Sequence, residues 1–281
     1  CVMRCIGLLS LALVGQCAAL HPDAIRLLHR SSTRVRVGNL RSSLIDTWLP
    51  STQVVTDIDD TVKSSGGVAL AGIPLGGVDV SYTRNAFYPG VFQFGLELAC
   101  SQRVPGRPPP KMAVLTARAT ELKWALEIKP SSQLCVRYAA LGAARGQPDW
   151  GVGPILYGSI QEWINQDRKG WRKFDNFRLL QADAPPKRRY VFIGDNGYSE
   201  RDLEAAQRIT SAMPGALRAI FLHAVSPDTQ PAPLPEDGEV GGVPLLYFRT
   251  YATAASKAVQ HGLFGVRAMR RVLDAVEVEM A

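Results

Sequence analysis

The chain has little cysteine and little histidine. Three of its five cysteines lie within the first 17 residues, which leaves Cys100 and Cys135 in the body, and neither belongs to a CxxC motif. The four histidines are isolated from one another. We therefore expect neither a disulfide framework nor a structural zinc site. We predict that Cys100 and Cys135 are buried free thiols, although a secreted chain could pair them.

Long hydrophobic runs are also absent. Beyond the first residues, no segment reaches the roughly 20 apolar residues that a membrane helix needs, so we expect the body of the chain to be soluble. Residues 1–21 resemble a short signal peptide, because Arg4 precedes an apolar run, Cys5–Val14, that is followed by small residues. The alternative is an apolar helix packed on the core. The first interpretation sends the chain into the secretory pathway, and the second leaves it in the cytoplasm.

The charge is unbalanced toward the positive side. The chain carries 32 lysines and arginines against 25 acidic residues, a net charge of +7. This excess favours anionic partners, among them phosphate esters, acidic membrane surfaces and nucleic acid. The basic residues are scattered, and no basic-aromatic motif accompanies them, so nucleic acid is not expected as a partner.

The 281 residues, 46% of them hydrophobic, suffice for one sizeable core. Short β-branched runs alternate with helical patterns, which is typical of a parallel sheet flanked by helices, a Rossmann-like α/β fold. We predict an extension at 22–51, a catalytic domain at 52–250 and a C-terminal helical segment at 251–281, interrupted near Gly262 and Gly265. The predicted strands are Gln53–Thr56, Met112–Thr116, Ile155–Tyr157, Tyr190–Ile193 and Ala219–Leu222, and the predicted helices are Gly90–Ser101, Ala119–Ile128, Trp171–Gln181 and Glu200–Ala212.

An acidic motif, DIDDT, begins at Asp57 and directly follows the predicted strand Gln53–Thr56. Two carboxylates two residues apart at a strand end suit a nucleophile, Asp57, beside a general acid/base, Asp59. Two anions repel, so a carboxylate that attacks phosphate needs a metal, and Asp57 could offer one oxygen to phosphorus and the other to Mg²⁺. A calcium loop is excluded, because Val62 and Val68 stand where it requires glycine and glutamate.

Further polar side chains follow other predicted elements. Thr116 ends a predicted strand and offers a hydroxyl to a phosphate oxygen. Lys173 lies near the start of a predicted helix, where either it or Lys169 could reach the phosphate. Asp195 follows another predicted strand, in a Gly-Asp-Asn-Gly turn, where it could bind Mg²⁺. The carboxyl ends of parallel strands meet at one edge of a sheet, so we expect these groups to converge on Asp57.

This order of motifs resembles that of the haloacid dehalogenase-type phosphatases. Three stretches, DIDDTVKSS from Asp57, FYPG from Phe87 and VFIGDNG from Val191, are similar to the catalytic domain of the actin-patch phosphatidate phosphatase family. The similarity covers roughly Thr52 to Thr250, and its most specific part is the motif at Asp57.

The resemblance implies Mg²⁺-dependent hydrolysis of phosphatidate or a related lipid phosphate through an aspartyl-phosphate intermediate. A phosphotransferase or phosphomutase, which passes the phosphoryl group to another acceptor, is an alternative. A scaffold of the same fold without turnover is a second one, against which the intact acidic motif argues. The resemblance assigns catalysis to Asp57 and Asp59, phosphate binding to Thr61, Thr116 and Lys173, and metal binding to Asp57, Asp59, Asp195 and Asp202.

The chain departs from the family pattern at two places. The family usually has a second aspartate five positions after the first in its last motif, where this chain has Glu200, and Asp202 lies seven positions after Asp195. Either Glu200 or Asp202 is then the second acidic partner. Ala117 and Arg118 replace residues of the Asn-Ser type, so the resemblance does not fix the lipid specificity.

The spacing of the motifs also bears on substrate size. Phosphatases of this architecture that act on small metabolites usually carry a large cap, and neither Thr61–Thr116 nor Thr116–Lys173 is long enough for one. The glycine-rich stretch Val62–Tyr88 is predicted to form a small hairpin flap, and Ser226–Val243 a long loop. An open site admits a phosphate that projects from a surface. We therefore predict a phosphorylated lipid or another large phosphosubstrate, with peripheral contact between the protein and an anionic membrane.

Overall fold

The structure is a computed structural model. The predicted leader, residues 1–21, lies outside the residues that it describes, and so does the predicted extension, 22–51, apart from Ser51. The predicted helix Ala119–Ile128 is described only at 119 and at 127–128. No helix in the described part of the chain is long and apolar enough to cross a membrane. The described residues are 51–70, 73–74, 77–101, 103, 107–119, 127–158, 169–185, 187–197, 201–228 and 232–281.

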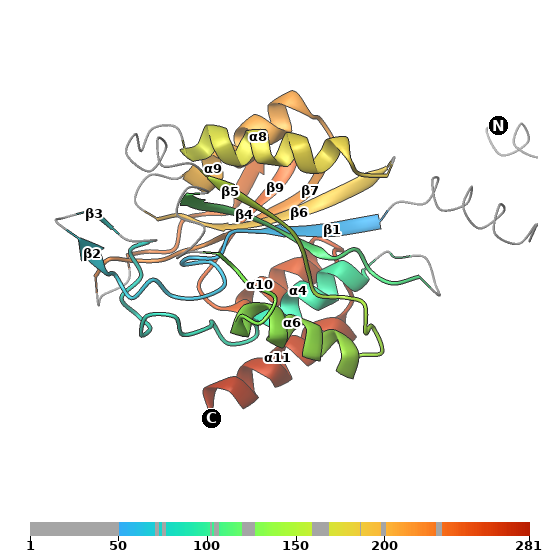
Figure 1. The fold of residues 1–281 in the computed structure, drawn as a ribbon, viewed down its shortest axis with the longest axis horizontal. Helices are drawn as coiled ribbons and strands as arrows, with labels where there is room; N and C mark the ends of the chain where they lie inside the picture. The colour runs from blue at the N-terminus through green and yellow to red at the C-terminus, as the bar shows by residue number, and fades with distance from the viewer. Residues whose placement is uncertain are drawn as a thin grey trace, which may run out of the picture. The chain divides into compact units, whose positions relative to one another are not determined.

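A seven-stranded sheet in the order β5-β4-β1-β6-β7-β9-β8 forms the middle layer (Figure 1). All neighbouring strands are parallel except β8, which pairs antiparallel with β9. The fold is therefore α/β with a mostly parallel sheet, consistent with a Rossmann-like arrangement. The strands are β1 (Ser51–Thr56), β4 (Met112–Ala119), β5 (Val152–Gly158), β6 (Arg188–Asp195), β7 (Leu217–His223), β8 (Gly238–Val240) and β9 (Val243–Phe248).

Helices cover both faces of this sheet. In Figure 1, α8 and α9 lie above it, and α4, α6, α10 and α11 lie below it. This covering by helices on both faces is what a parallel sheet requires. The helices are α4 (Val91–Cys100), α6 (Gln133–Ala144), α8 (Lys169–Ala182), α9 (Arg201–Ala212), α10 (Tyr251–Gln260) and α11 (Val266–Met280).

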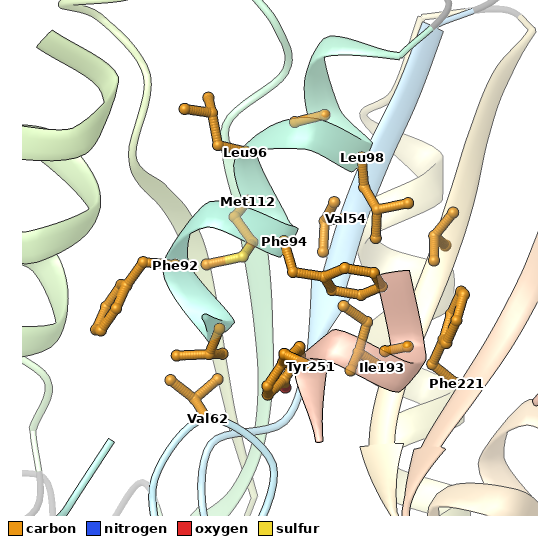
Figure 2. Close-up of a cluster of buried hydrophobic side chains, with 14 of the residues drawn as sticks. Val54, Val62, Phe92, Phe94, Leu96, Leu98, Met112, Ile193, Phe221 and Tyr251 are labelled. Atoms are coloured by element: carbon orange, nitrogen blue, oxygen red, sulfur yellow. The ribbon is translucent and has the colours of Figure 1, made fainter. Parts of the chain in front are cut away.

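The core is divided between the two faces. Successive side chains of a strand point to opposite faces, yet Val54 and Val55 of β1 are both fully buried. Val54 packs in a cluster with Phe94 of α4 and Tyr251 of α10 (Figure 2), whereas Val55 shares the opposite cluster with Phe177 of α8. Burial on both faces explains why the central strands are continuous apolar runs in the sequence.

The five predicted strands are confirmed as β1, β4, β5, β6 and β7, and three predicted helices are confirmed as α4, α8 and α9. The predicted interruption near Gly262 and Gly265 separates α10 from α11. The predicted hairpin also occurs, since β2 (Ala69–Leu70) and β3 (Ile73–Pro74) pair antiparallel within Val62–Tyr88.

Three expectations were wrong or incomplete. The predicted long loop Ser226–Val243 contains β8 and the start of β9, which are joined through Gly241 and Gly242 with positive φ angles, a hairpin signal that its acidic composition obscured. Helix α6 was not predicted, because only Leu134, Tyr138 and Gly142 of its residues are buried and its apolar stripe is narrow. Cys100 and Cys135 are free, as expected, but half-buried.

The chain order across the sheet points to one edge. From β1 the chain proceeds to β4 and β5, and it then crosses to β6 on the other side of β1. In open α/β sheets, ligands bind beyond the carboxyl ends of the strands where the order reverses in this way. The reversal lies at β1, whose last residue, Thr56, immediately precedes Asp57.

Candidate active site

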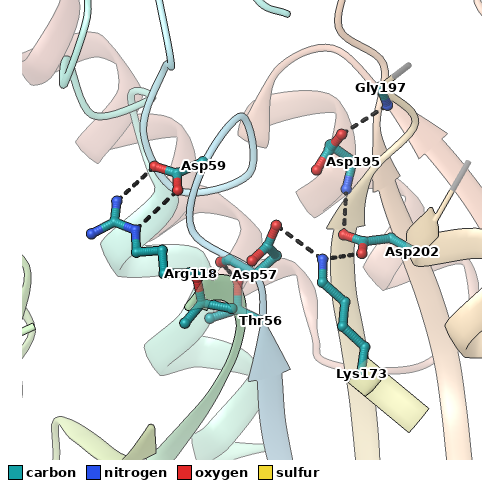
Figure 3. A network of polar contacts seen from close by, with 9 residues as sticks. Thr56, Asp57, Asp59, Arg118, Lys173, Asp195, Gly197 and Asp202 are labelled. Atoms are coloured by element: carbon teal, nitrogen blue, oxygen red, sulfur yellow. Dashed lines mark hydrogen bonds and ion pairs between the residues drawn. The ribbon is translucent and has the colours of Figure 1, made fainter. Parts of the chain in front are cut away.

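The carboxyl ends of β1 and β6 bring Asp57 and Asp195 to the same edge of the sheet. The Asp57 amide donates a hydrogen bond to the carbonyl of Ile193, 3.0 Å away, which extends the pairing of β1 with β6 past the end of β1. Asp195 is the last residue of β6. Helices α8 and α9 add Lys173 and Asp202 to this edge (Figure 3).

Lys173 connects two carboxylates. Its Nζ atom lies 3.0 Å from Oδ2 of Asp57 and also donates to Oδ1 of Asp202. All three side chains are buried. Burial alone lowers the pKa of a lysine, but the charges of Asp202, Asp57 and Asp195 outweigh it and raise the pKa of Lys173 above its usual value. Lys173 is therefore a fixed positive charge beside Asp57.

Asp202 is held against β6 by a close approach to the backbone. Its Oδ2 accepts a hydrogen bond from the Asp195 amide at 3.1 Å. A Cβ atom on Gly194 would overlap the Asp202 carboxylate, so glycine is required there for the helix residue to reach the strand. This contact explains the glycine of the Gly-Asp sequence at the end of β6.

Three carboxylates form a group suited to a cation. One oxygen from each of Asp57, Asp195 and Asp202 lies within 4.8 Å of the others. Burial raises the pKa of Asp57 to about 7, against the opposing charge of Lys173 and with a further contribution from Asp202. Burial also raises the pKa of Asp195 well above its usual value. These raised pKa values show that Lys173 alone does not stabilise the ionised forms of all three carboxylates, and a hard cation with oxygen ligands would do so.

Asp59 lies on the other side of Asp57 and is paired differently. Its two carboxylate oxygens accept hydrogen bonds from Nε and Nη2 of Arg118, at 3.1 and 2.7 Å (Figure 3). The structure therefore does not bring the Asp59 carboxylate into the acidic group beside Lys173. The sequence did not reveal this pairing.

The two predicted threonines lie near these groups. Thr116 belongs to β4, and its Oγ1 accepts a hydrogen bond from the Arg118 amide at 3.2 Å. Thr61 is fully buried, its Oγ1 has no hydrogen-bond partner among the described residues, and its carbonyl accepts a hydrogen bond from Tyr251 at 2.8 Å. Of the alternatives left open, Asp202 joins the cluster, whereas Glu200 lies outside the described residues.

Asp60, inside the acidic motif, has a structural role that the sequence did not reveal. Its carboxylate accepts hydrogen bonds from the amides of Ser65, Val78 and Asp79. It therefore binds the chain to the acidic motif on both sides of the β2–β3 hairpin. Its carbonyl is 2.7 Å from Nδ1 of the buried His223. The backbone of Asp60 has a positive φ angle, which a short polar residue tolerates. Two consecutive aspartates directly after a strand could have indicated this turn in the sequence.

Comparison of the chain with protein-family models, with curated proteins and with solved structures gives no match.

Proposed function

We propose that the protein is a Mg²⁺-dependent phosphohydrolase that attacks a phosphate monoester with Asp57. The observation that carries this proposal is the placement of the Asp57 carboxylate at the strand-end edge beside a buried lysine, 3.0 Å away, and beside two further carboxylates, those of the half-buried Asp195 and the buried Asp202. A nucleophile that attacks an anion needs positive charge around it, and this arrangement offers both a lysine and a cluster that fits a cation.

Asp57, Asp195 and Asp202 are the residues that would hold the metal. Bound Mg²⁺ would offset the charge of the phosphate and of the attacking carboxylate, which is its usual contribution to phosphoryl transfer. Burial and mutual repulsion raise the pKa values of Asp57 and Asp195 when no cation is bound. A bound cation would stabilise their ionised forms, so these carboxylates fit it.

The remaining residues act on the phosphate and on protons. Lys173 and the Thr116 hydroxyl hold phosphate oxygens, while Asp57 attacks phosphorus in line with the departing alkoxide. Asp59 protonates that alkoxide and later removes a proton from the water that hydrolyses the aspartyl phosphate. Because Arg118 holds both oxygens of Asp59, this step requires Asp59 to exchange at least one of its hydrogen bonds with Arg118 for one with the leaving group.

We further propose that the fold is haloacid dehalogenase-like, with a small hairpin flap and no large cap, and that the substrate is a phosphorylated lipid such as phosphatidate. Support comes from the segment between the acidic motif and α4, where the described residues form no helix, and where the strands are those of the short β2–β3 hairpin. Val80 and Tyr82 in this segment are each 37% exposed, as expected of side chains that touch a membrane interface.

A phosphatase panel tests the proposal. Purified protein is assayed on phosphatidate, diacylglycerol pyrophosphate, phosphoproteins and small phosphate esters, with Mg²⁺ and with chelator. We expect Mg²⁺-dependent release of inorganic phosphate, fastest from the lipid. Transfer of the phosphoryl group to an added alcohol without free phosphate would favour the phosphotransferase, and no turnover of any substrate would contradict the proposal. Turnover of sugar phosphates alone would contradict the lipid preference.

A further inference from the structure

Three basic side chains lie near one another beside Asp59. Arg118, on β4, binds Asp59. Lys63 and Arg84 lie in the stretch Val62–Tyr88 that contains the β2–β3 hairpin, called the hairpin segment below. A guanidinium group has five N–H donors, and Asp59 occupies two of those on Arg118, whose side chain is 21% exposed. Arg118 therefore keeps donors for a second anion.

The backbone places Lys63 and Arg84 beside Asp59. Lys63 forms β-bridges with both Asp59 and Phe87, and the Asn85 amide donates to the carbonyl of Ser64 at 2.8 Å. The segment 84–87 therefore runs along the loop at 63–66. Gly66 allows this approach, because a Cβ atom there would lie 2.8–2.9 Å from Arg84 atoms.

Neither Lys63 nor Arg84 forms an ion pair with an acidic side chain that the structure describes. The Lys63 ammonium donates to the neutral amide of Asn85, and the exposed Arg84 has no ion pair in the described part of the chain. The pKa of Lys63 is lowered, first by burial and second by the positive charges of Arg118 and Arg84, with only Asp59 opposing them. The neighbouring carboxylate of Asp60 is committed to backbone amides.

The carboxylate of Asp79 is also committed. It accepts hydrogen bonds from the Tyr88 hydroxyl at 2.8 Å and from the Ser81 amide at 3.0 Å. Of the carboxylates beside these basic side chains, that of Asp59 therefore pairs with one of them, Arg118, while those of Asp60 and Asp79 are bound elsewhere. A dianion next to the reacting phosphate would balance the remaining positive charge.

We propose that Lys63, Arg84 and Arg118 form a subsite for a second anionic phosphate next to the phosphate that Asp57 attacks. This inference rests on the proposed function, since it places the subsite relative to the reacting group. The second phosphate belongs either to the same substrate, as in a pyrophosphate or a closely spaced bisphosphate, or to the headgroup of a neighbouring phospholipid.

Binding measurements test the subsite without turnover. The Asp57→Asn variant is titrated calorimetrically with inorganic phosphate and with inorganic pyrophosphate at a fixed concentration of free Mg²⁺. The same titrations are repeated with two double variants, in which either Lys63→Gln or Arg84→Gln is added to Asp57→Asn. Arg178→Gln, which removes an exposed positive charge from the second half of α8, is the matched control.

We expect pyrophosphate to bind at least tenfold more tightly than phosphate, and each hairpin substitution to weaken pyrophosphate about tenfold and phosphate about threefold or less. Arg178→Gln should leave both affinities unchanged. A folded Asp57→Asn protein that binds neither anion would overturn the proposed phosphate site itself. If phosphate binds but the substitutions weaken the binding of neither anion, the second phosphate does not belong to the same substrate molecule.

A vesicle assay separates the two sources of the second phosphate. The wild-type chain and the two hairpin variants hydrolyse phosphatidate in phosphatidylcholine vesicles with and without phosphatidylserine. If the neighbouring headgroup is the source, pyrophosphate shows no advantage, and the variants lose the rate increase that phosphatidylserine causes. The proposal is overturned if the substitutions change neither the pyrophosphate affinity nor this rate increase.

Discussion

At the scale of single residues, the contact between Gly194 and Asp202 determines where the acidic cluster lies. We predict that Gly194→Ala displaces the Asp202 carboxylate from Lys173 and from the Asp195 amide, because the new methyl group would occupy its place. A displacement of about 1 Å in a catalytic site can lower the rate about 100-fold, and we expect a loss of that order in phosphate release.

Gly238→Ala is the matched control for this change. No atom lies within 4 Å of a Cβ at Gly238, so the same added methyl group should leave turnover unchanged. Circular dichroism shows whether both variants fold. If the two folded variants hydrolyse substrate at the same rate, the role assigned to Asp202 is wrong.

At the scale of elements, a buried ion pair fastens α11 to α4. Glu97 of α4 is 4% exposed and accepts two hydrogen bonds from Arg271 of α11, both of 2.6 Å. Near the other end of α11, Glu279 accepts a hydrogen bond from the Gly90 amide at 2.7 Å. The C-terminal helix thereby stabilises the helix that follows the hairpin segment.

We predict that Arg271→Met lowers the free energy of unfolding by about 1–2 kcal/mol, because it leaves the Glu97 carboxylate buried without its main partner. The expected loss is small because Arg271 is about a third exposed and Arg145 remains 3.7 Å from Glu97. Urea denaturation measures the change. Arg270→Met, at the exposed neighbouring position, should change stability by less than about 0.5 kcal/mol. Equal losses in the two variants would contradict the assignment.

The sequence predicts those elements whose signals are local. A carboxylate that directly follows a buried β-branched strand is visible in the sequence at Asp57 and at Asp195, and parallel strands bring such ends together. The choice between Asp202 and Glu200 depends on how α9 packs against β6, and the pairing of Asp59 with Arg118 depends on the register between β1 and β4. Both are tertiary contacts without a local pattern, and so sequence spacing could not decide them.

At the scale of the whole molecule, the acidic cluster couples stability to pH. Because the pKa of Asp57 is raised on folding, its contribution to stability is present below its unfolded pKa of about 4 and is lost as the pH rises through about 7. In metal-free buffer, Asp57→Asn should therefore melt at a higher temperature than the wild type at about pH 8, and the difference should be clearly smaller at about pH 5, where much of this contribution remains.

Thermal denaturation of both proteins, with and without Mg²⁺, measures this difference. Added Mg²⁺ should raise the melting temperature of the wild type at the higher pH more than that of Asp57→Asn, because the metal binds the deprotonated carboxylate. Asp175→Asn, at an exposed position of α8, is the control. A metal-free Asp57→Asn protein that melts below the wild type at the higher pH would contradict the charge assignment.

In the proposed mechanism Asp57 itself takes up the phosphoryl group, and trapping that group on the protein is the decisive experiment. Asp59→Asn keeps the nucleophile but loses the proton transfer, which should slow turnover about 10²–10⁴-fold and let the phosphoenzyme accumulate. After incubation with Mg²⁺ and phosphatidate and an acid quench, mass spectrometry of the peptides should find the phosphoryl group on Asp57, and none in the Asp57→Asn protein. A phosphoryl group on another residue, or hydrolysis by Asp57→Asn at the wild-type rate, would contradict the account.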